Sequence, residues 1–292
     1  MKGALPMDER DIQIFQSLME TRNVTKTAQA LYMTQSAITK RLRKLEEELG
    51  SSLFLRSVRG LTPTPSADSI LSEMDRLQVS LQRIKSLSQF AQGHVAGHLK
   101  FGVSVNYARY TLPPILKQYM TDYPGVRIDV ATGQSLELFT RLQENRLSMA
   151  VLRGQFPWAG ASLLLSREAV YAVTSRENWG RDLSNLPYIH RQSDKPFMSR
   201  IQRWKLEQHI VESPMSIQVN DVSTCLSMIS SGIGWSVLPE ICLKDRKDLL
   251  LQPLTFRDGT PFMRSTYVLY QEEYARLPQV KIFLDRLKGG PA

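Results

Sequence analysis

The chain has 292 residues, of which 42% are hydrophobic and 22% charged, and this composition favours a folded protein of about two domains over a disordered chain. It has no run of about 18 apolar residues, and its first ten positions include several charges, so we expect neither a membrane-spanning helix nor a secretory signal. Its two cysteines are too few for a disulfide scaffold, and we therefore expect a cytoplasmic protein. The net charge of +9 suits a polyanionic partner if the basic residues cluster.

Three short helices are predicted in the first 50 residues. Apolar side chains from Ile12 to Met19 recur at helical spacing within residues 8–21, and a second helix runs from Asn23 to about residue 31. Thr34 is the expected N-cap of a third helix, which Gly50 ends. The tight turn between the second and third helices predicts a helix-turn-helix.

The basic residues cluster in this region and just after it. Between Arg22 and Leu61 there are eight Lys and Arg residues against three Glu. Residues 53–56 and 61–62 read as two short strands around Gly60, which suits a tight hairpin. The sequence therefore predicts a wing after the third helix.

A long helix is predicted from Thr64 onward. Its apolar residues alternate spacings of four and three, as in a coiled-coil seam, at Ile70, Met74, Leu77, Leu81 and Ile84, and Leu87 and Phe90 extend the apolar face. We expect this seam to pair two copies of the chain, and packing of the seam within its own chain is the alternative.

Strands and helices alternate after residue 97. We expect strands at residues 99–103, 126–130, 148–152, 169–174, 188–190, 216–219, 235–238 and 266–270, and helices at residues 112–122, 136–145, 200–208, 222–231 and from 278 onward. This alternation predicts a largely parallel sheet with ligands at the carboxyl ends of its strands.

The motifs in these elements resemble a known family. They are Ala-Gln-Ala-Leu (28–31), Thr-Gln-Ser-Ala-Ile-Thr-Lys (34–40), Leu-Glu-Glu-Glu-Leu-Gly (45–50), Leu-Phe (53–54) and Arg-Gly-Leu-Thr (59–62), and later Ser-Leu-Glu-Leu (135–138), Met-Ala-Val (149–151) and Ile-Ser-Ser-Gly-Ile-Gly-Trp-Ser-Val-Leu-Pro-Glu (229–240). In this order and spacing, the chain resembles the LysR-type transcriptional regulators over nearly its whole length.

The resemblance implies a domain plan. Residues 1–65 would form an all-α winged helix-turn-helix and residues 66–92 a dimerisation linker helix. Residues 93–292 would form an α/β effector-binding region of two Rossmann-like subdomains, similar to periplasmic binding proteins. Subdomain I would span about 93–160 and 265–292 and subdomain II about 161–264, with crossings near residues 153–154 and 261–265.

A helix-turn-helix places the start of its third helix in the major groove. Gln35 is the expected base discriminator, with Ser36, Thr39 and Arg43 as further base contacts. Arg41 and Lys44 are candidate phosphate contacts or solvated surface charges. The full set of expected DNA-binding residues is Thr25, Thr34, Gln35, Ser36, Thr39, Lys40, Arg43, Arg56 and Arg59.

A small carboxylate is the expected effector, because helix N-termini and one arginine follow the strands of the second region. The candidate contacts are Ser104, Asn106, Gln134, Ser135, Arg153, Gln192, Ser193 and Asn220. The expected partners are double-stranded promoter DNA, this effector, further copies of the chain in a homodimer that assembles to a homotetramer, and RNA polymerase. We expect no membrane partner, cofactor or metal.

Two other classes of protein stay open. An enzyme is disfavoured because we find no nucleophile elbow, Walker loop, dinucleotide fingerprint or zincin motif. An architectural DNA-binding protein would not need the 200 residues after the linker. Cys225 and Cys242 could form a redox pair, although both lie in apolar stretches, and His94 with His98 lacks a third metal ligand.

Overall fold

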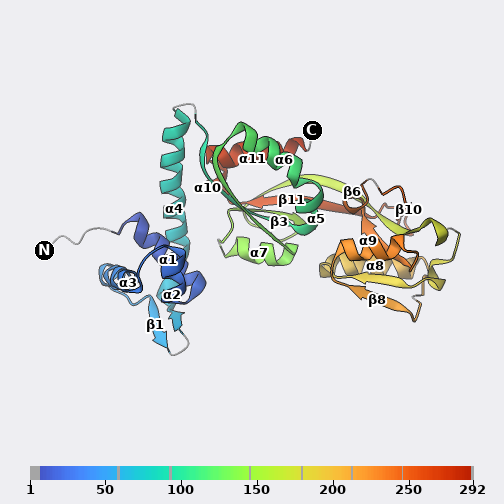
Figure 1. The fold of residues 1–292 in the computed structure, drawn as a ribbon, viewed down its shortest axis with the longest axis horizontal. Coiled ribbons are helices and arrows are strands. Elements are labelled where there is room, and N and C mark those ends of the chain that lie inside the picture. The colour runs from blue at the N-terminus through green and yellow to red at the C-terminus, as the bar shows by residue number, and fades with distance from the viewer. Residues whose placement is uncertain are drawn as a thin grey trace. The chain divides into compact units, whose positions relative to one another are not determined.

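The computed structural model describes residues 7–57, 60–91, 94–144, 146–178, 180–211, 213–244 and 246–290. The chain forms two compact units, Met1–Gly93 and His94–Ala292 (Figure 1). In the described ranges, no helix is both long and apolar enough to cross a membrane.

The first unit is a winged helix-turn-helix followed by a long helix. Its elements are α1 (Glu9–Thr21), α2 (Val24–Ala30), α3 (Gln35–Leu49), β1 (Phe54–Ser57), β2 (Gly60–Pro63) and α4 (Pro65–Ala91). Phe15, Leu18 and Ile38 are fully buried in its core, and the Phe15 ring packs on Phe54 with centroids 5.9 Å apart. The apolar spacing of the sequence therefore corresponds to one core shared by three helices and the wing.

Local capping chemistry sets the ends of these helices. The Thr34 hydroxyl accepts the N–H of Ala37 at 3.2 Å at the start of α3, and Gly50 ends that helix with a φ of 64°. The Thr64 hydroxyl accepts the N–H of Ala67 at 3.2 Å at the start of α4. Both predicted caps of α3 are confirmed.

The wing hairpin is held close to the end of α1. β1 and β2 pair antiparallel, and the N–H of Leu61 donates to the carbonyl of Arg22 at 2.9 Å. Gly60 has a φ of 117°, and a Cβ there would lie 2.7 Å from that carbonyl oxygen. A larger residue at position 60 would have to displace the backbone, so glycine is required for this contact.

The apolar seam of α4 divides between two roles. Ile70, Met74 and Leu81 pack against the core of the winged helix-turn-helix. In the same helix, Ile84 is 66% exposed, and Leu77, Leu87 and Phe90 are also exposed. The alternative of packing within the chain therefore holds for part of the seam, and the exposed part is available to a partner.

The second unit is built on a nine-stranded sheet in the order β4-β3-β5-β11-β6-β9-β7-β8, with β10 also paired to β6. Its strands are β3 (Ala96–Ser104), β4 (Gly125–Gly133), β5 (Met149–Arg153), β6 (Ala161–Ser175), β7 (Tyr188–Arg191), β8 (Ser216–Val219), β9 (Trp235–Pro239), β10 (Leu249–Pro253) and β11 (Met263–Tyr270). Strands β3, β4 and β5 run parallel, as do β7, β8 and β9. The expectation of a largely parallel sheet is wrong in the middle, because β6 and β11 run antiparallel to their neighbours.

The chain crosses between the two halves of this sheet inside β6. Residues 161–169 pair with β11, whereas residues 170–175 pair with β9 and β10. The crossing expected near residues 153–154 therefore lies later in the chain, and residues 161–168, which we expected in subdomain II, belong to the first half of the sheet.

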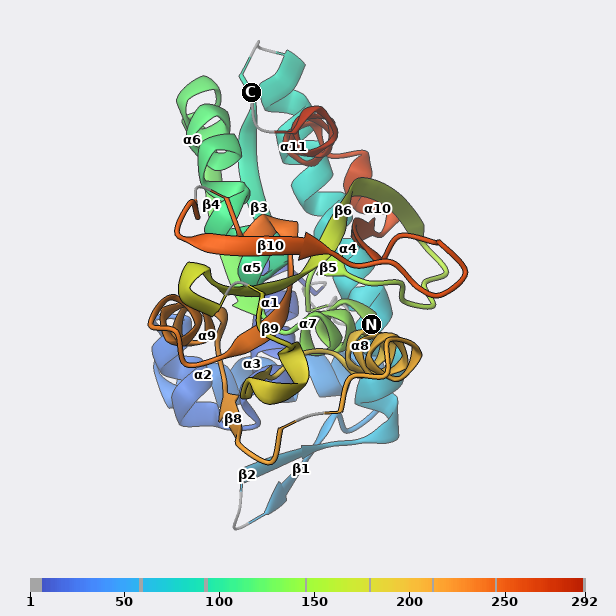
Figure 2. The same cartoon turned by 90° about the vertical axis from the view of Figure 1, so that its right-hand side faces the viewer.

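Helices cover both faces of each half. They are α5 (Val105–Tyr110), α6 (Leu112–Asp122), α7 (Ser135–Gln143), α8 (Lys195–Glu207), α9 (Val222–Ser230), α10 (Glu272–Ala275) and α11 (Pro278–Gly289). α6 and α11 pack on one face of the first half and α7 on the other (Figure 1). α8 and α9 lie on opposite sides of β9 (Figure 2). In both halves, the segments that we expected to hold a ligand follow the carboxyl ends of the parallel strands.

Candidate functional site

The N-terminal half of α3 presents a polar, exposed face. Gln35, Ser36, Lys40 and Arg43 are exposed and Thr39 is half-buried, whereas Ile38 and Leu42 point into the core. Positions 35, 36, 39, 40 and 43 share one side of a helix, since residues three and four apart are neighbours on its surface. The structure therefore groups the predicted base-contacting side chains on one surface.

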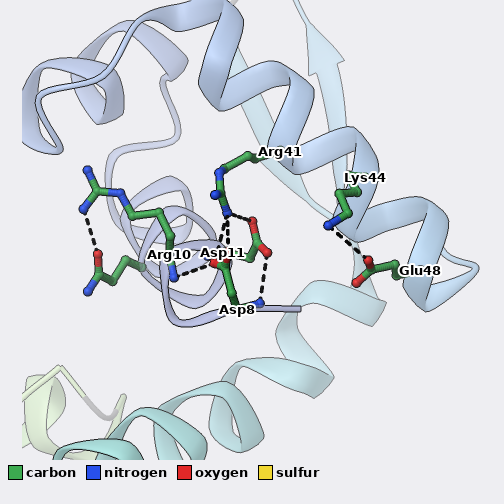
Figure 3. Close-up of polar contacts among 7 residues, drawn as sticks. Asp8, Arg10, Asp11, Arg41, Lys44 and Glu48 are labelled. Carbon is green, nitrogen blue, oxygen red and sulfur yellow. Dashed lines mark hydrogen bonds and ion pairs between the residues drawn. The ribbon is translucent and has the colours of Figure 1, made fainter. Parts of the chain in front are cut away.

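Several residues of this surface already have partners within the chain. Thr34 serves as the cap of α3, and its hydroxyl also lies 3.0 Å from that of Ser36. Arg43 pairs with Glu47 at 3.0 Å and Lys44 with Glu48 at 3.5 Å, the latter drawn in Figure 3. The Arg43–Glu47 pair is exposed and contributes little to stability, so a phosphate could replace the Glu47 carboxylate, whereas the Glu48 side chain is only 17% exposed.

Arg41, a candidate phosphate contact or solvated charge, forms two ion pairs within the chain. Its Nη1 lies 2.7 Å from Asp11 Oδ1 and 3.0 Å from Asp8 Oδ1 (Figure 3). The Asp11 side chain is only 4% exposed, and hydrogen bonds with Asp11 and Asp8 raise the pKa of Arg41. Arg41 therefore ties α3 to the start of α1.

Replacing Arg41 with Met should lower the free energy of unfolding of the first unit by about 1.5–3 kcal/mol, because the buried Asp11 carboxylate loses a charged hydrogen-bond donor. The salt dependence of DNA binding should stay the same. Lys40→Met is the matched control, since it removes an exposed charge from the same helix and should reduce the salt slope by about one unit without affecting stability. Urea unfolding and DNA titrations across a salt series test both variants, and an unchanged stability of Arg41→Met would contradict the structural role.

The remaining predicted DNA contacts lie outside α3. Thr25 is exposed on α2, and Arg56 is exposed on β1. Arg59 lies outside the described residues. Tyr32, which the sequence reasoning missed, is 97% exposed in the turn between α2 and α3, with a φ of 54°. In the sequence, Tyr32 stands out only as an aromatic residue in the turn after the second helix, outside the apolar spacing of the helices.

In the second unit, the predicted effector contacts fall into two groups. Ser104, Asn106, Gln134, Ser135 and Arg153 lie at the ends of β3, β4 and β5 or directly after them. The backbone N–H of Arg153 donates to the Ser135 hydroxyl at 3.0 Å, so β5 is bound to the start of α7. The structure therefore links Ser135 and Arg153 directly and places Ser104 on the neighbouring strand.

The second group follows β7 and β8, which run in parallel register. The N–H of Gln192 donates to the carbonyl of Val219 at 3.3 Å, so Gln192, Ser193 and Asn220 lie at one edge of the sheet. Gln192 and Asn220 are exposed, as is Gln134 in the first group, and Ser193 is half-buried beside Asp194. Gln134, Gln192, Ser193 and Asn220 are therefore accessible to a ligand, but they do not form a buried polar site.

Arg153 belongs to a cluster of buried charges on β5, β6 and β11, and the other members of this cluster were not predicted from the sequence. Arg264 on β11 stands opposite Glu168 on β6, and Thr266 stands opposite Arg153 on β5. The Arg153 guanidinium pairs with Glu168, whose other oxygen accepts the N–H of Ile241, and Arg264 pairs with Asp194. Arg153 is 3% exposed and Arg264 is 7% exposed.

This cluster has more donors than it can satisfy. Of the described atoms, Nε and Nη1 of both Arg153 and Arg264, Nε of Arg191 and the hydroxyls of Ser104 and Thr266 are buried without a hydrogen-bond partner. Burial and the charge of Arg153 lower the pKa of Arg264 to about 10, and burial raises the pKa of Glu168. Unpaired buried donors are costly, so the cluster is suited to accept an anion.

Cys225 and Cys242 are both free and buried, and burial raises the pKa of each thiol. A raised pKa disfavours the thiolate that disulfide exchange needs. His98 Nε2 lies 2.7 Å from Asp129 Oδ2, and in the described part of the chain no three His, Cys, Asp or Glu residues are grouped as metal ligands.

Comparison with known proteins agrees with this geometry. Residues 10–68 match the family described as "Bacterial regulatory helix-turn-helix protein, lysR family", and residues 92–291 match the "LysR substrate binding domain". A Bacillus subtilis (strain 168) protein, "Uncharacterized HTH-type transcriptional regulator YraN", is 34% identical over 97% of this chain and 98% of its own length.

Solved structures share the fold over the full length. A full-length OxyR variant from Pseudomonas aeruginosa has a TM-score of 0.72 at 18% identity and covers 97% of this chain and 98% of its own. Full-length CbnR complexed with its target DNA has a TM-score of 0.59 at 18% identity and covers 97% of this chain and 99% of its own. The two family matches together span both units, and the chain therefore belongs to the LysR family of transcriptional regulators.

Proposed function

We propose that the protein binds promoter DNA through α3 and the wing, and that a small anionic effector, held where the two halves of the second unit meet, controls this binding. The observation that carries the DNA-binding role is the polar face of α3. The Gln35 and Lys40 side chains on it are exposed and, among the described residues, have no hydrogen bond or ion pair. Side chains in this state can contact DNA without breaking internal bonds.

The α3 face can supply both kinds of DNA contact. The Gln35 amide, at the first position of α3, can donate to and accept from an adenine edge in the major groove, and Ser36 and Thr39 can contact bases beside it. Thr25, Lys40 and Arg56 lie around this face and are suited to phosphates, where they add affinity without reading sequence. The relative CbnR has been solved with its target DNA, which supports the same use of this fold here.

The assignment of domains is part of the proposal. Residues 1–65 bind DNA, residues 66–92 pair two chains, and the remainder binds the effector and assembles dimers into a tetramer. A ligand that binds one arrangement of the tetramer more tightly shifts the population toward it, and so alters DNA bending and contact with RNA polymerase.

Two substitutions test the assigned DNA contacts. Gln35→Ala should reduce the preference for the operator over scrambled DNA by about 1–3 kcal/mol, because a bidentate base contact is lost. Arg56→Met should weaken binding to both DNAs about equally and reduce the salt slope by about one unit. Titrations of the upstream intergenic fragment and a scramble of equal length across a salt series measure both effects, and equal effects of the two variants would refute the roles.

A further inference from the structure

The turn between α2 and α3 holds a tyrosine in a conformation that suits glycine. The N–H of Met33 donates to the carbonyl of Ala28 at 2.8 Å, and the N–H of Tyr32 donates to the carbonyl of Gln29 at 3.3 Å. This pair of bonds is the Schellman motif, in which a residue just past the helix is left-handed, and Tyr32 has a φ of 54°. Because a Cβ crowds the next carbonyl oxygen in this conformation, glycine and asparagine are favoured there and tyrosine is costly.

Packing within the chain does not offset this cost. Tyr32 is 97% exposed, whereas its neighbours Leu31 and Met33 pack against the core of the winged helix-turn-helix. In the same unit, α3 ends in the left-handed conformation with Gly50, which has no Cβ to crowd the backbone. Folding alone would therefore favour glycine or asparagine at position 32, and a strained residue without a folding benefit is a candidate for a functional role.

The strained turn lies directly beside the polar face of α3. Tyr32 is three positions before Gln35, and both Gln35 and Ser36 are exposed at the start of that helix. Arg10 fixes the turn from the other side, because its Nη2 donates to the carbonyl of Leu31 at 2.7 Å. The backbone of Tyr32 is therefore held in place before DNA binds, and a tyrosine loses little conformational entropy when its two side-chain torsions become ordered.

We propose that Tyr32 is a further DNA contact, whose phenol hydroxyl donates a hydrogen bond to a backbone phosphate at the edge of the major groove that α3 enters. This inference rests on the proposed function and adds to it a residue outside the predicted set. When the start of a recognition helix lies in the major groove, the turn before it lies near the phosphates that border the groove, and tyrosine is among the side chains that bond to them. The phenol is neutral, so its contact adds affinity for any sequence without neutralising a phosphate charge.

Tyr32→Phe tests the hydroxyl alone, since it keeps the ring and the backbone conformation. We expect this variant to bind the upstream intergenic fragment and a scramble of equal length about tenfold more weakly in each case, because a hydrogen bond to a charged group is lost. The salt slope should stay that of the unmodified chain. Lys40→Met is the comparison in the same titrations, since loss of a charged contact should reduce the slope by about one unit.

Tyr32→Asn separates the DNA contact from folding. Asparagine tolerates the left-handed conformation, so the core amides of α3 should exchange with solvent deuterium about two- to tenfold more slowly than in the unmodified chain. The affinity for both DNAs should nevertheless fall at least as far as in Tyr32→Phe. A more stable helix-turn-helix that binds DNA more weakly cannot owe the loss to misfolding.

His209→Asn is the matched control. His209 is exposed just past the end of α8 and has the same φ of 54°. The same pair of bonds surrounds it, because the N–H of Ile210 donates to the carbonyl of Lys205 at 3.0 Å and the N–H of His209 to that of Leu206 at 3.2 Å. His209→Asn therefore makes the corresponding change in the second unit, away from α3 in the sequence, and should leave the affinity for both DNAs unchanged.

Three results would overturn the proposal. They are equal affinities for Tyr32→Phe and the unmodified chain, a loss on the intergenic fragment without a loss on the scramble, which would indicate a base contact, and faster exchange of α3 in Tyr32→Asn, which would show that tyrosine serves folding. If Lys40→Met weakens binding while Tyr32→Phe does not, the proposed function stands and the Tyr32 contact alone fails. If the unmodified chain does not bind either DNA, both fail.

Discussion

Replacing Glu168 with Ala is expected to lower the free energy of unfolding of the second unit by about 3–5 kcal/mol. The Arg153 side chain is almost fully buried, and Glu168 is its only ion-pair partner among the described residues. Without that carboxylate, a guanidinium charge remains in a low-dielectric environment, and the N–H of Ile241 also loses its acceptor. The loss should therefore far exceed that of a surface pair.

The size of the effect depends on burial, which two further variants can show. Glu73→Ala removes one partner of the exposed Glu73–Arg76 pair on α4 and should change stability by less than about 0.5 kcal/mol. Arg153→Met combined with Glu168→Met removes both charges and should recover most of the lost stability, because a buried ion pair can be replaced by apolar side chains at little cost. Urea unfolding monitored by circular dichroism measures all three, and a loss below about 1 kcal/mol for Glu168→Ala would mean that water reaches Arg153.

The first unit was predictable because its signals are local. The Thr34 cap, the Gly50 terminator and the apolar spacing from Ile12 to Leu49 each act within a few residues, and the structure has the corresponding helices. Local signals do not identify distant partners. Arg41 looks like any basic residue of a recognition helix, and its partners Asp8 and Asp11 lie 33 and 30 positions earlier in the chain.

The second unit was predictable as alternating strands and helices but not in its crossing strands. Half-buried and exposed positions alternate in the first part of β6, but residues 163–165 are all leucine, so the sequence there shows no alternation of apolar and polar residues. Strand register decides which residues face one another across β5, β6 and β11, and register is set by tertiary pairing. Arg153 could be predicted at a ligand site because it follows a buried run of the sequence. Arg264 was missed, although Arg264, Thr266 and Val268 are buried at alternate positions of β11.

Ile84→Asp is expected to dissociate the proposed dimer and weaken operator binding by about a hundredfold or more, because a monomer loses the second half-site and the high effective concentration that linkage provides. Ile84 continues the seven-residue spacing from Leu77, and both are exposed on α4 together with Leu87 and Phe90. An exposed apolar stripe of this kind is typical of an interface, and a buried carboxylate within it would remain unpaired.

Because Ile84 is exposed, its replacement should affect pairing of the chains without affecting folding. Ile84 is not part of the core that holds Met74 and Leu81, so Ile84→Asp should leave the winged helix-turn-helix folded and its unfolding midpoint nearly unchanged. Ile84→Met is the matched control, because it keeps an apolar side chain of similar size and should preserve both the dimer and the affinity. Sedimentation gives the oligomeric state and operator titration gives the affinity. A variant that stays dimeric with full operator affinity would show that two chains pair through another surface, while a monomer with full affinity would show that one helix-turn-helix is sufficient for the operator.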